Sequence, residues 1–271
     1  MGGKQSNLGR KWPYIKKKSP VTTFGVKGVG RGEFRVNRGI TIDEEQRLYV
    51  VDRNNQRIQI FTDEGEYVTE IHPNFNTNYP NDIAVGDGCI FVSSVPNLIY
   101  TFQATTTNNL IKTYLWEIKT PRGLTVDTNG ELYVADTYAN RVVVLNLELE
   151  CIRKIGEGSL DRPTDVKILM DIIFVADNNT SNTIHLFSKL GDLVNSFLNI
   201  KTNPIIQDTY ICFDLEYNLI VCSVFNASIM VLSSEGVLIH KIKLEDSPRG
   251  IAVTDNFRII CSNNQNSIVI F

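Results

Sequence analysis

Short apolar segments recur along almost the whole chain and are separated by polar turns. The clearest copies of the pattern read RGITIDEEQRLYVVDRNNQRIQIF, from Arg38, and RGLTVDTNGELYVADTYANRVVVL, from Arg122. Each contains an apolar strand, a polar turn, a second apolar strand that ends in Asp, and a third strand that begins at an Arg. This succession of short strands and turns predicts antiparallel sheets.

Weaker copies continue the pattern to the end of the sequence. One position near the start of each copy aligns throughout, at Gly39, Asp82, Gly123, Asp165, Tyr210 and Gly250. Neighbouring members of this set are 40 to 45 residues apart. Repeated units of this length with four strands each are typical of β-propeller blades. The sequence therefore predicts an all-β fold, namely a six-bladed β-propeller of four-stranded blades.

The sixth copy stops one strand short, at the terminal segment SIVIF. The segment VTTFG, residues 21–25, resembles the missing strand and has no blade of its own. We therefore predict that this N-terminal strand completes the last blade, which closes the ring and covers two sheet edges. The predicted organisation is a basic, disordered head over residues 1–20 and a propeller over residues 21–271.

The segments VVDRNNQRIQIF and LYVADTYANRVVVL resemble the NHL repeat, and the resemblance extends over residues 21–271. It implies a six-bladed propeller that binds proteins or RNA, since only a minority of such propellers are enzymes. Some NHL proteins are ubiquitin ligases that select substrates with the propeller. This chain has no RING-type set of Cys and His residues, so we expect at most an adaptor in such a pathway.

Charge divides the chain into two regions. Residues 1–20 carry a charge of +6 and no acidic residue, whereas residues 21–271 carry a net charge of −9. The basic residues of the head are Lys4, Arg10, Lys11, Lys16, Lys17 and Lys18. The opposite charges predict different partners for the head and the propeller. The five cysteines form no CxxC pair, which fits a reducing cytosol better than a disulfide framework.

The start of the head, MGGKQS, fits the N-myristoylation pattern, with Gly2 as the acylated residue. One myristoyl chain binds membranes only marginally, and a polybasic segment is a recognised second signal. We therefore expect a cytoplasmic protein held at an anionic, cytosolic membrane surface. The alternative is a disordered basic leader that either has no function or lies on the acidic rim of the propeller.

The loops that enter the blades carry most of the candidate interaction residues. These are Arg35, Arg38, Arg53, Arg122, Arg162 and Arg249, together with the aromatic side chain of Tyr138. Guanidinium groups bind phosphates and stack on bases, so a single-stranded RNA ligand is one interpretation. RNA affinity depends on uncompensated positive charge, and the same loops also carry acidic residues. We therefore favour a protein partner for a monomeric scaffold, with RNA as the alternative.

A ring of acidic residues offers a second candidate site. Asp52, Asp136 and Asp177 end equivalent strands, and Arg57 and Arg141 follow the first two by five residues. These acidic residues could together bind a ligand. Alternatively, each Asp could hold its own loop in place and pair with its own Arg. Recurrence of the unit from blade to blade favours the second interpretation.

Catalytic chemistry has weak support. Asp82 and Asp165 are candidates to face the central channel, but two carboxylates are few for the calcium site of a propeller hydrolase. The three histidines are spread over different parts of the fold, and the sequence lacks the GxSxG motif. We predict no enzyme activity, metal or cofactor, and a cation-dependent hydrolase is the third interpretation.

Overall fold

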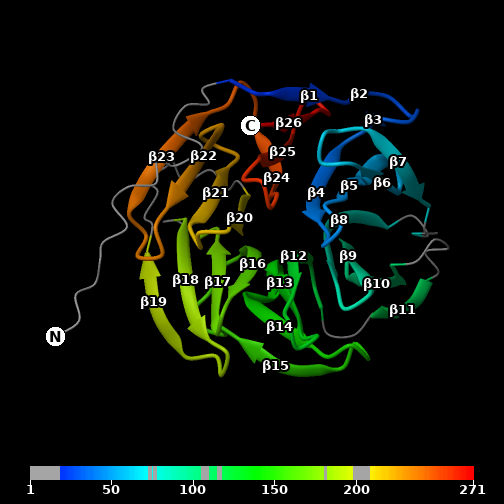
Figure 1. Ribbon diagram of the computed structural model, residues 1–271. Coiled ribbons are helices and arrows are strands. Elements are labelled where there is room, and N and C mark those ends of the chain that lie inside the picture. Colours follow the sequence, from blue (N-terminus) through cyan, green and yellow to red (C-terminus); the bar gives the residue numbers. More distant parts are fainter. Residues whose placement is uncertain are drawn as a thin grey trace.

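The computed structural model of the protein describes residues 19–72, 75, 78–104, 110–114, 118–179, 182–197 and 208–271. In this part of the chain, six four-stranded antiparallel sheets surround a central axis (Figure 1). The predicted all-β, six-bladed propeller is therefore confirmed. Among the described residues, no helix has the length and apolar character needed to cross a membrane.

The first three blades follow one another along the chain. Blade 1 consists of β4 (Asn37–Ile42), β5 (Leu48–Asp52), β6 (Arg57–Phe61) and β7 (Tyr67–Ile71). Blade 2 consists of β8 (Tyr79–Gly86), β9 (Cys89–Val95), β10 (Leu98–Gln103) and β11 (Leu110–Tyr114). Blade 3 consists of β12 (Pro121–Val126), β13 (Leu132–Asp136), β14 (Arg141–Leu145) and β15 (Cys151–Ile155).

The remaining blades complete the ring. Blade 4 consists of β16 (Pro163–Leu169), β17 (Ile172–Asp177), β18 (Thr183–Ser188) and β19 (Leu193–Phe197). Blade 5 consists of β20 (Thr209–Phe213), β21 (Leu219–Ser223), β22 (Ser228–Leu232) and β23 (Leu238–Lys243). Blade 6 consists of β24 (Pro248–Val253), β25 (Ile259–Asn263), β26 (Ile268–Ile270) and the N-terminal β1 (Thr22–Phe24).

The N-terminal strand closes the ring, as predicted. In blade 6, β1 pairs antiparallel with β26, with Thr22 opposite Ile270 and Phe24 opposite Ile268. Figure 1 shows the blue β1 beside the red C-terminal strands. After β1, a short parallel pair, β2 (Val26–Lys27) and β3 (Glu33–Phe34), leads the chain into blade 1. The first and last parts of the described chain thus hold each other in place.

Each interface between neighbouring blades has its own apolar core. The second strand of a blade lies between two interfaces, and its alternate side chains point to opposite sides. In β13, Leu132 and Val134 pack toward blade 2, whereas Tyr133 and Ala135 pack toward blade 4. All four side chains are buried. Burial on both faces explains why these strands read as continuous apolar runs.

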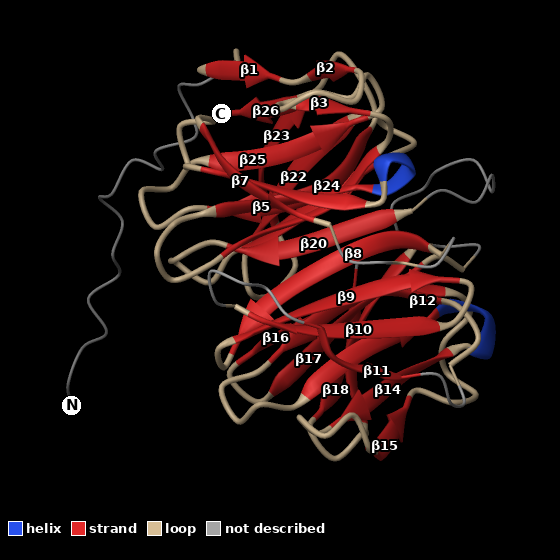
Figure 2. Ribbon diagram, turned by 90° about the vertical axis from the view of Figure 1, so that its right-hand side faces the viewer, coloured by secondary structure: helices blue, strands red, loops and turns tan. Residues whose placement is uncertain are grey.

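Two single-turn helices mark one face of the ring. They are η2 (Arg53–Asn55) and η3 (Thr137–Ala139), in the loops after β5 and β13. Figure 2 shows both helices, in blue, on the same side of the stacked sheets. We call this side the mouth face. The connections between blades return to the same side, which brings the predicted arginine-bearing loops together there.

Candidate binding site at the channel mouth

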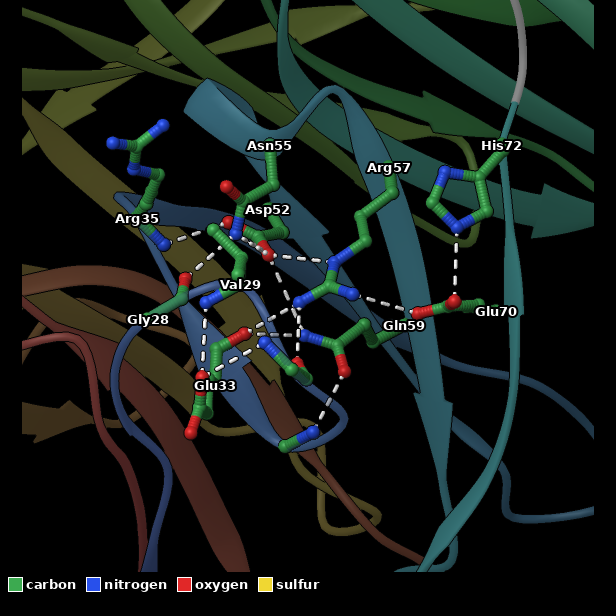
Figure 3. Close-up of polar contacts among 12 residues, drawn as sticks. Gly28, Val29, Glu33, Arg35, Asp52, Asn55, Arg57, Gln59, Glu70 and His72 are labelled. Atoms are coloured by element: carbon green, nitrogen blue, oxygen red, sulfur yellow. Dashed lines mark hydrogen bonds and ion pairs between the residues drawn. The ribbon is translucent and has the colours of Figure 1, made fainter.

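Asp52, the blade 1 copy of the repeated Asp, forms hydrogen bonds and an ion pair within and beside its own blade (Figure 3). Asp52 accepts a hydrogen bond from the backbone N–H of Arg35 at 2.9 Å. Its other carboxylate oxygen lies 2.9 Å from Nε of Arg57. Arg57 also forms a 2.8 Å ion pair with Glu70 and donates to the backbone carbonyls of Gly30, before β3, and Glu33, at its start. This network fixes the N-terminal connection to blade 1.

Equivalent contacts occur in blades 3 and 4. Asp136 accepts hydrogen bonds from two backbone N–H groups, at residues 119 and 120, and lies 3.5 Å from Nε of Arg141. Asp177 accepts from the backbone N–H of Asp161 and lies 3.4 Å from Nε2 of His185. The carboxylates bind their own loops, which supports the structural interpretation over a ligand-gripping ring.

Two other carboxylates connect neighbouring blades around the channel. Asp82 accepts a 3.0 Å hydrogen bond from the backbone N–H of Leu124, in the next blade. Asp165 accepts a 2.8 Å hydrogen bond from the backbone N–H of Ile211, also in the next blade. Both side chains are buried. Their role in the described structure is to join the inner strands of adjacent blades.

Small residues alternate with these carboxylates around the axis for a steric reason. A Cβ atom on Gly39 would lie 2.6 Å from the Cα of Asp82, and one on Gly123 would lie 2.5 Å from the Cα of Asp165. Cβ atoms do not approach neighbouring backbone so closely. Each bulky carboxylate therefore requires a glycine on the preceding blade, which explains the Gly–Asp–Gly–Asp order of the first four repeats.

Lys167 provides the positive charge between the two carboxylates. Its Nζ lies 2.9 Å from Oδ1 of Asp165 and donates to the carbonyl oxygen of Leu124 at 3.2 Å. Burial opposes its charge, but Asp165 and Asp82 outweigh burial and raise the pKa of Lys167. Burial, and secondarily the nearby Asp165, raises the pKa of Asp82 to about 7, although Lys167 acts in the opposite direction. The cluster is thus close to charge balance near neutral pH.

The hydrolase interpretation depends on whether the channel carboxylates could bind a calcium ion. The candidate calcium ligands Asp82 and Asp165 each accept a hydrogen bond from a backbone amide, and Asp165 also pairs with Lys167. Within the described ranges, no three His, Cys, Asp or Glu side chains lie close enough together to hold a metal ion. Beyond Lys167, a cavity of about 200 Å³ is lined mainly by aliphatic side chains such as Ile42 and Val85. Thr41, Thr125, Lys167 and Cys212 also line it.

Four of the six predicted arginines come together where the channel reaches the mouth face. They are Arg38, Arg53, Arg122 and Arg249. Three of them hold the same repeat position, directly before the glycine of the inner strand. The carboxylate of Asp208 lies among them. It forms an ion pair with Arg122, lies 3.8 Å from Nη1 of Arg38, and accepts a 3.3 Å hydrogen bond from the hydroxyl of Tyr210.

The electrostatics of this channel-mouth cluster are unbalanced. Burial, together with the like charges of Arg38 and Arg122, lowers the pKa of Arg53 to about 10. Burial and Arg38 also lower the pKa of Arg249. Burial opposes the charge of Arg122 too, but Asp208 outweighs it and raises the pKa of that guanidinium. Asp208 pairs with two of the four guanidinium groups, and Asp246 also acts on Arg249, so the mutual repulsion of the arginines is only partly relieved.

Two aromatic side chains flank the cluster. The guanidinium of Arg53 lies over the ring of Tyr79, 5.3 Å from its centroid, and it donates a 3.0 Å hydrogen bond to Asn81. Tyr138, on η3, interacts electrostatically with Arg122. Tyr79 is 47% exposed and Tyr138 is 64% exposed. Exposed rings beside partly buried guanidiniums are the kind of anchors that interfaces use.

Arg35 and Arg162 do not join this cluster. Figure 3 shows the guanidinium of Arg35 turned away from the Asp52 network, to which only its backbone contributes. Arg162 donates its backbone N–H to Asn140 at 3.0 Å. Within the described part of the chain, neither forms an ion pair with Asp208. The head residues Gly2, Lys4, Arg10, Lys11, Lys16, Lys17 and Lys18 lie outside the described residues.

Sequence reasoning did not identify Asp208, Tyr210 or Lys167 as site residues. Lys167 carries a local signal, because residues two apart on a strand share a face. It follows Asp165 by two positions within β16. The repeat alignment could thus have placed Lys167 at the channel, whereas Asp208 lies just before β20 and carries no such signal.

Comparisons with known proteins agree with this architecture. The family described as NHL repeat matches residues 38–61 and 119–145. Protein lin-41 of Caenorhabditis elegans is 40% identical over 62 residues, which cover 23% of this chain and 5% of that protein. Protein brain tumor of Drosophila melanogaster is 28% identical over 142 residues, covering 49% of this chain and 14% of that protein. This chain thus corresponds to a small part of either relative.

Solved structures with similar folds include a propeller domain and a lyase. The WD40 beta propeller domain of Doa1 superposes with a TM-score of 0.69 at 13% identity, covering 89% of this chain and 79% of that one. A streptogramin B lyase structure gives a TM-score of 0.67 at 16% identity, covering 92% of this chain and 86% of that one. At such low identity the likeness concerns the fold alone.

Proposed function

The chain is an NHL-repeat β-propeller, and we propose that it is a non-catalytic scaffold that binds a protein partner at the mouth of its channel. One observation carries this proposal. Arg38, Arg53, Arg122 and Arg249 lie together at the channel mouth, two of them paired with Asp208, with exposed aromatic rings at their edge. Concentrated, partly desolvated guanidiniums beside Tyr side chains are enriched in protein interfaces.

Protein fits this surface better than RNA because of the surrounding charge. Residues 21–271 have a net charge of −9, and Asp161, Glu245 and Asp246 lie in loops of the same face. Nucleic-acid affinity rests largely on phosphate neutralisation by an extended basic surface. RNA remains the second candidate, since Tyr79 and Tyr138 are exposed and could stack on bases. The similarity to lyase structures is a similarity of fold alone.

Photocrosslinking in cells tests this function directly. A photoreactive phenylalanine analogue replaces Tyr138 in the full chain, and the same analogue replaces Tyr217 on the opposite face as a matched control. We expect Tyr138 adducts that resist ribonuclease, are removed by protease, and disappear when Arg38 and Arg122 are changed to Gln. Ribonuclease-sensitive adducts at Tyr138 would instead support the RNA function. Equal adducts from both faces would contradict a specific site.

We also propose that the head tethers the propeller to an anionic cytosolic membrane surface through acylated Gly2 and the six basic residues. The support is the sequence MGGKQS and the charge of +6 over residues 1–20. Metabolic labelling with an alkyne-tagged myristate tests this. Incorporation and membrane flotation should both be lost in Gly2→Ala, and an unlabelled wild-type chain would contradict the tether.

A further inference from the structure

Asp208 differs from the other acidic residues of the mouth face in how it is held. Its side chain is 20% exposed, whereas those of Asp52, Asp136 and Asp177 are 0% exposed. Those three accept hydrogen bonds from backbone N–H groups. Within the described residues, Asp208 is contacted by side chains alone, those of Arg38, Arg122 and Tyr210. No backbone group in that part of the chain depends on its carboxylate.

The arginines around Asp208 can accept more negative charge than it supplies. Arg38 lies 3.8 Å from Asp208, a loose ion pair, and its Nε is buried without a hydrogen-bond partner among the described residues. Arg53 and Arg249 contact neutral amides, Asn81 and Asn264. A buried, unpaired guanidinium nitrogen is costly. The cluster thus resembles an anion site that a resident carboxylate fills only in part.

We propose, on the basis of the proposed function, that Asp208 occupies the position at Arg122 and Arg38 that a carboxylate of the partner would take. The ligand is an acidic peptide segment whose Asp or Glu side chain displaces Asp208 from Arg122 and Arg38. A second acidic side chain of the same segment would then reach Arg53 or Arg249. Asp208 is therefore an internal competitor that weakens binding and raises the partner concentration needed for occupancy.

The hydroxyl of Tyr210 provides a reason for carboxylate selectivity. Burial and Asp208 raise the pKa of Tyr210, so the hydroxyl stays protonated and donates to the site. A planar carboxylate can accept from this hydroxyl and from a guanidinium at once, as Asp208 does. Bidentate pairing of arginine with a planar carboxylate is also geometrically favoured. Because the resident group is itself a carboxylate, the observations favour an acidic peptide over an RNA phosphate.

Fluorescence anisotropy with two probes tests this assignment. The probes are fluorescein-labelled hexaglutamate and fluorescein-labelled octauridine, titrated with the full chain and its variants. Asp208→Asn keeps the size of the side chain and removes its charge. Because charge-assisted hydrogen bonds are stronger than neutral ones, and the resident carboxylate no longer competes for Arg122, we expect hexaglutamate to bind Asp208→Asn roughly tenfold more tightly than wild type. Asp208→Asn with Arg122→Gln should lose the gain.

Asp161→Asn is the matched control, because it removes one exposed acid from the same face without touching the cluster. A similar gain in Asp161→Asn, or no gain in Asp208→Asn, would overturn the proposal. A larger gain for octauridine than for hexaglutamate would also overturn it, in favour of RNA. Asp208→Ser provides a second neutral variant if the melting temperature of Asp208→Asn falls. Protein crosslinks at Tyr138 without an effect of Asp208→Asn would remove this inference and leave the proposed function standing.

Discussion

Two charged clusters lie along the same channel and are built in opposite ways. In the interior, Asp165 pairs with Lys167, whose charge also acts on Asp82, and each carboxylate accepts a backbone N–H from the next blade. At the mouth, Asp208 pairs with two of the four arginines, and its described contacts are all with side chains. The interior cluster is nearly neutral and fully bonded, whereas the mouth carries surplus positive charge.

This difference separates a structural role from a binding role. Buried charges are tolerated where they are paired and hydrogen-bonded, and the interior cluster meets that condition while joining neighbouring blades. The mouth cluster keeps like charges close together, which contributes nothing to stability unless a ligand arrives. Mutations should therefore have large effects on folding in the interior and small effects at the mouth.

Lys167→Met should have the largest effect on stability. The variant leaves Asp165 and Asp82 without their shared cation, and breaking a buried ion pair costs about 3–5 kcal/mol. The free energy of unfolding from urea titration measures the loss. Lys241→Met, on the exposed face of β23, is the control and should change stability by less than about 0.5 kcal/mol. A loss below about 1 kcal/mol in Lys167→Met would contradict the structural role of the interior cluster.

Gly123→Ala probes the packing of the same interior. The new methyl group would meet the backbone of Asp165, with the Cα only 2.5 Å away, so two blades must move apart. Overpacking of this kind costs about 1–3 kcal/mol. In Gly30→Ala the methyl group meets only the flexible carboxyl of Glu33, and the change should be smaller. Equal melting temperatures for the two variants would show that the blades are not tightly joined at this point.

Much of this arrangement could be predicted from the repeats. Arg38, Arg122 and Arg249 each precede the glycine of an inner strand, so the symmetry of a ring must bring them around one axis. The same alignment correctly assigned residues 21–25 to the last blade. It could not reveal Asp208, because that residue precedes the repeat in which Tyr210 replaces the glycine. Nor could it show that the charge of Lys167 acts on Asp82, since the two residues are 85 positions apart in sequence.

The pH dependence of stability should distinguish Asp82 from the arginines of the mouth. Burial raises the pKa of Asp82 from 3.8 to about 7, so the folded state binds a proton that the unfolded state has released. This stabilisation is fully present below pH 4 and is lost as the pH rises through 7. Between pH 6 and pH 8, wild type should lose about 1 kcal/mol relative to Asp82→Asn. A constant difference between the two proteins over this range would contradict the assignment.

Arg249→Gln should have the smallest effect on folding and thereby tests the other half of the comparison. Arg249 bonds to Asn264 at 3.1 Å, and a glutamine amide can donate to the same oxygen, while the repulsion from Arg38 disappears. The two effects oppose each other, so stability should change by no more than about 0.5 kcal/mol. Salt adds a sharper readout, because it screens repulsion between partly exposed charges. Wild type should gain stability relative to Arg249→Gln as sodium chloride rises from 0.05 to 0.5 M in urea titrations. A loss above about 2 kcal/mol would mean that the mouth, like the interior, is held together by its charges, and that the surplus of arginines is no sign of a binding site.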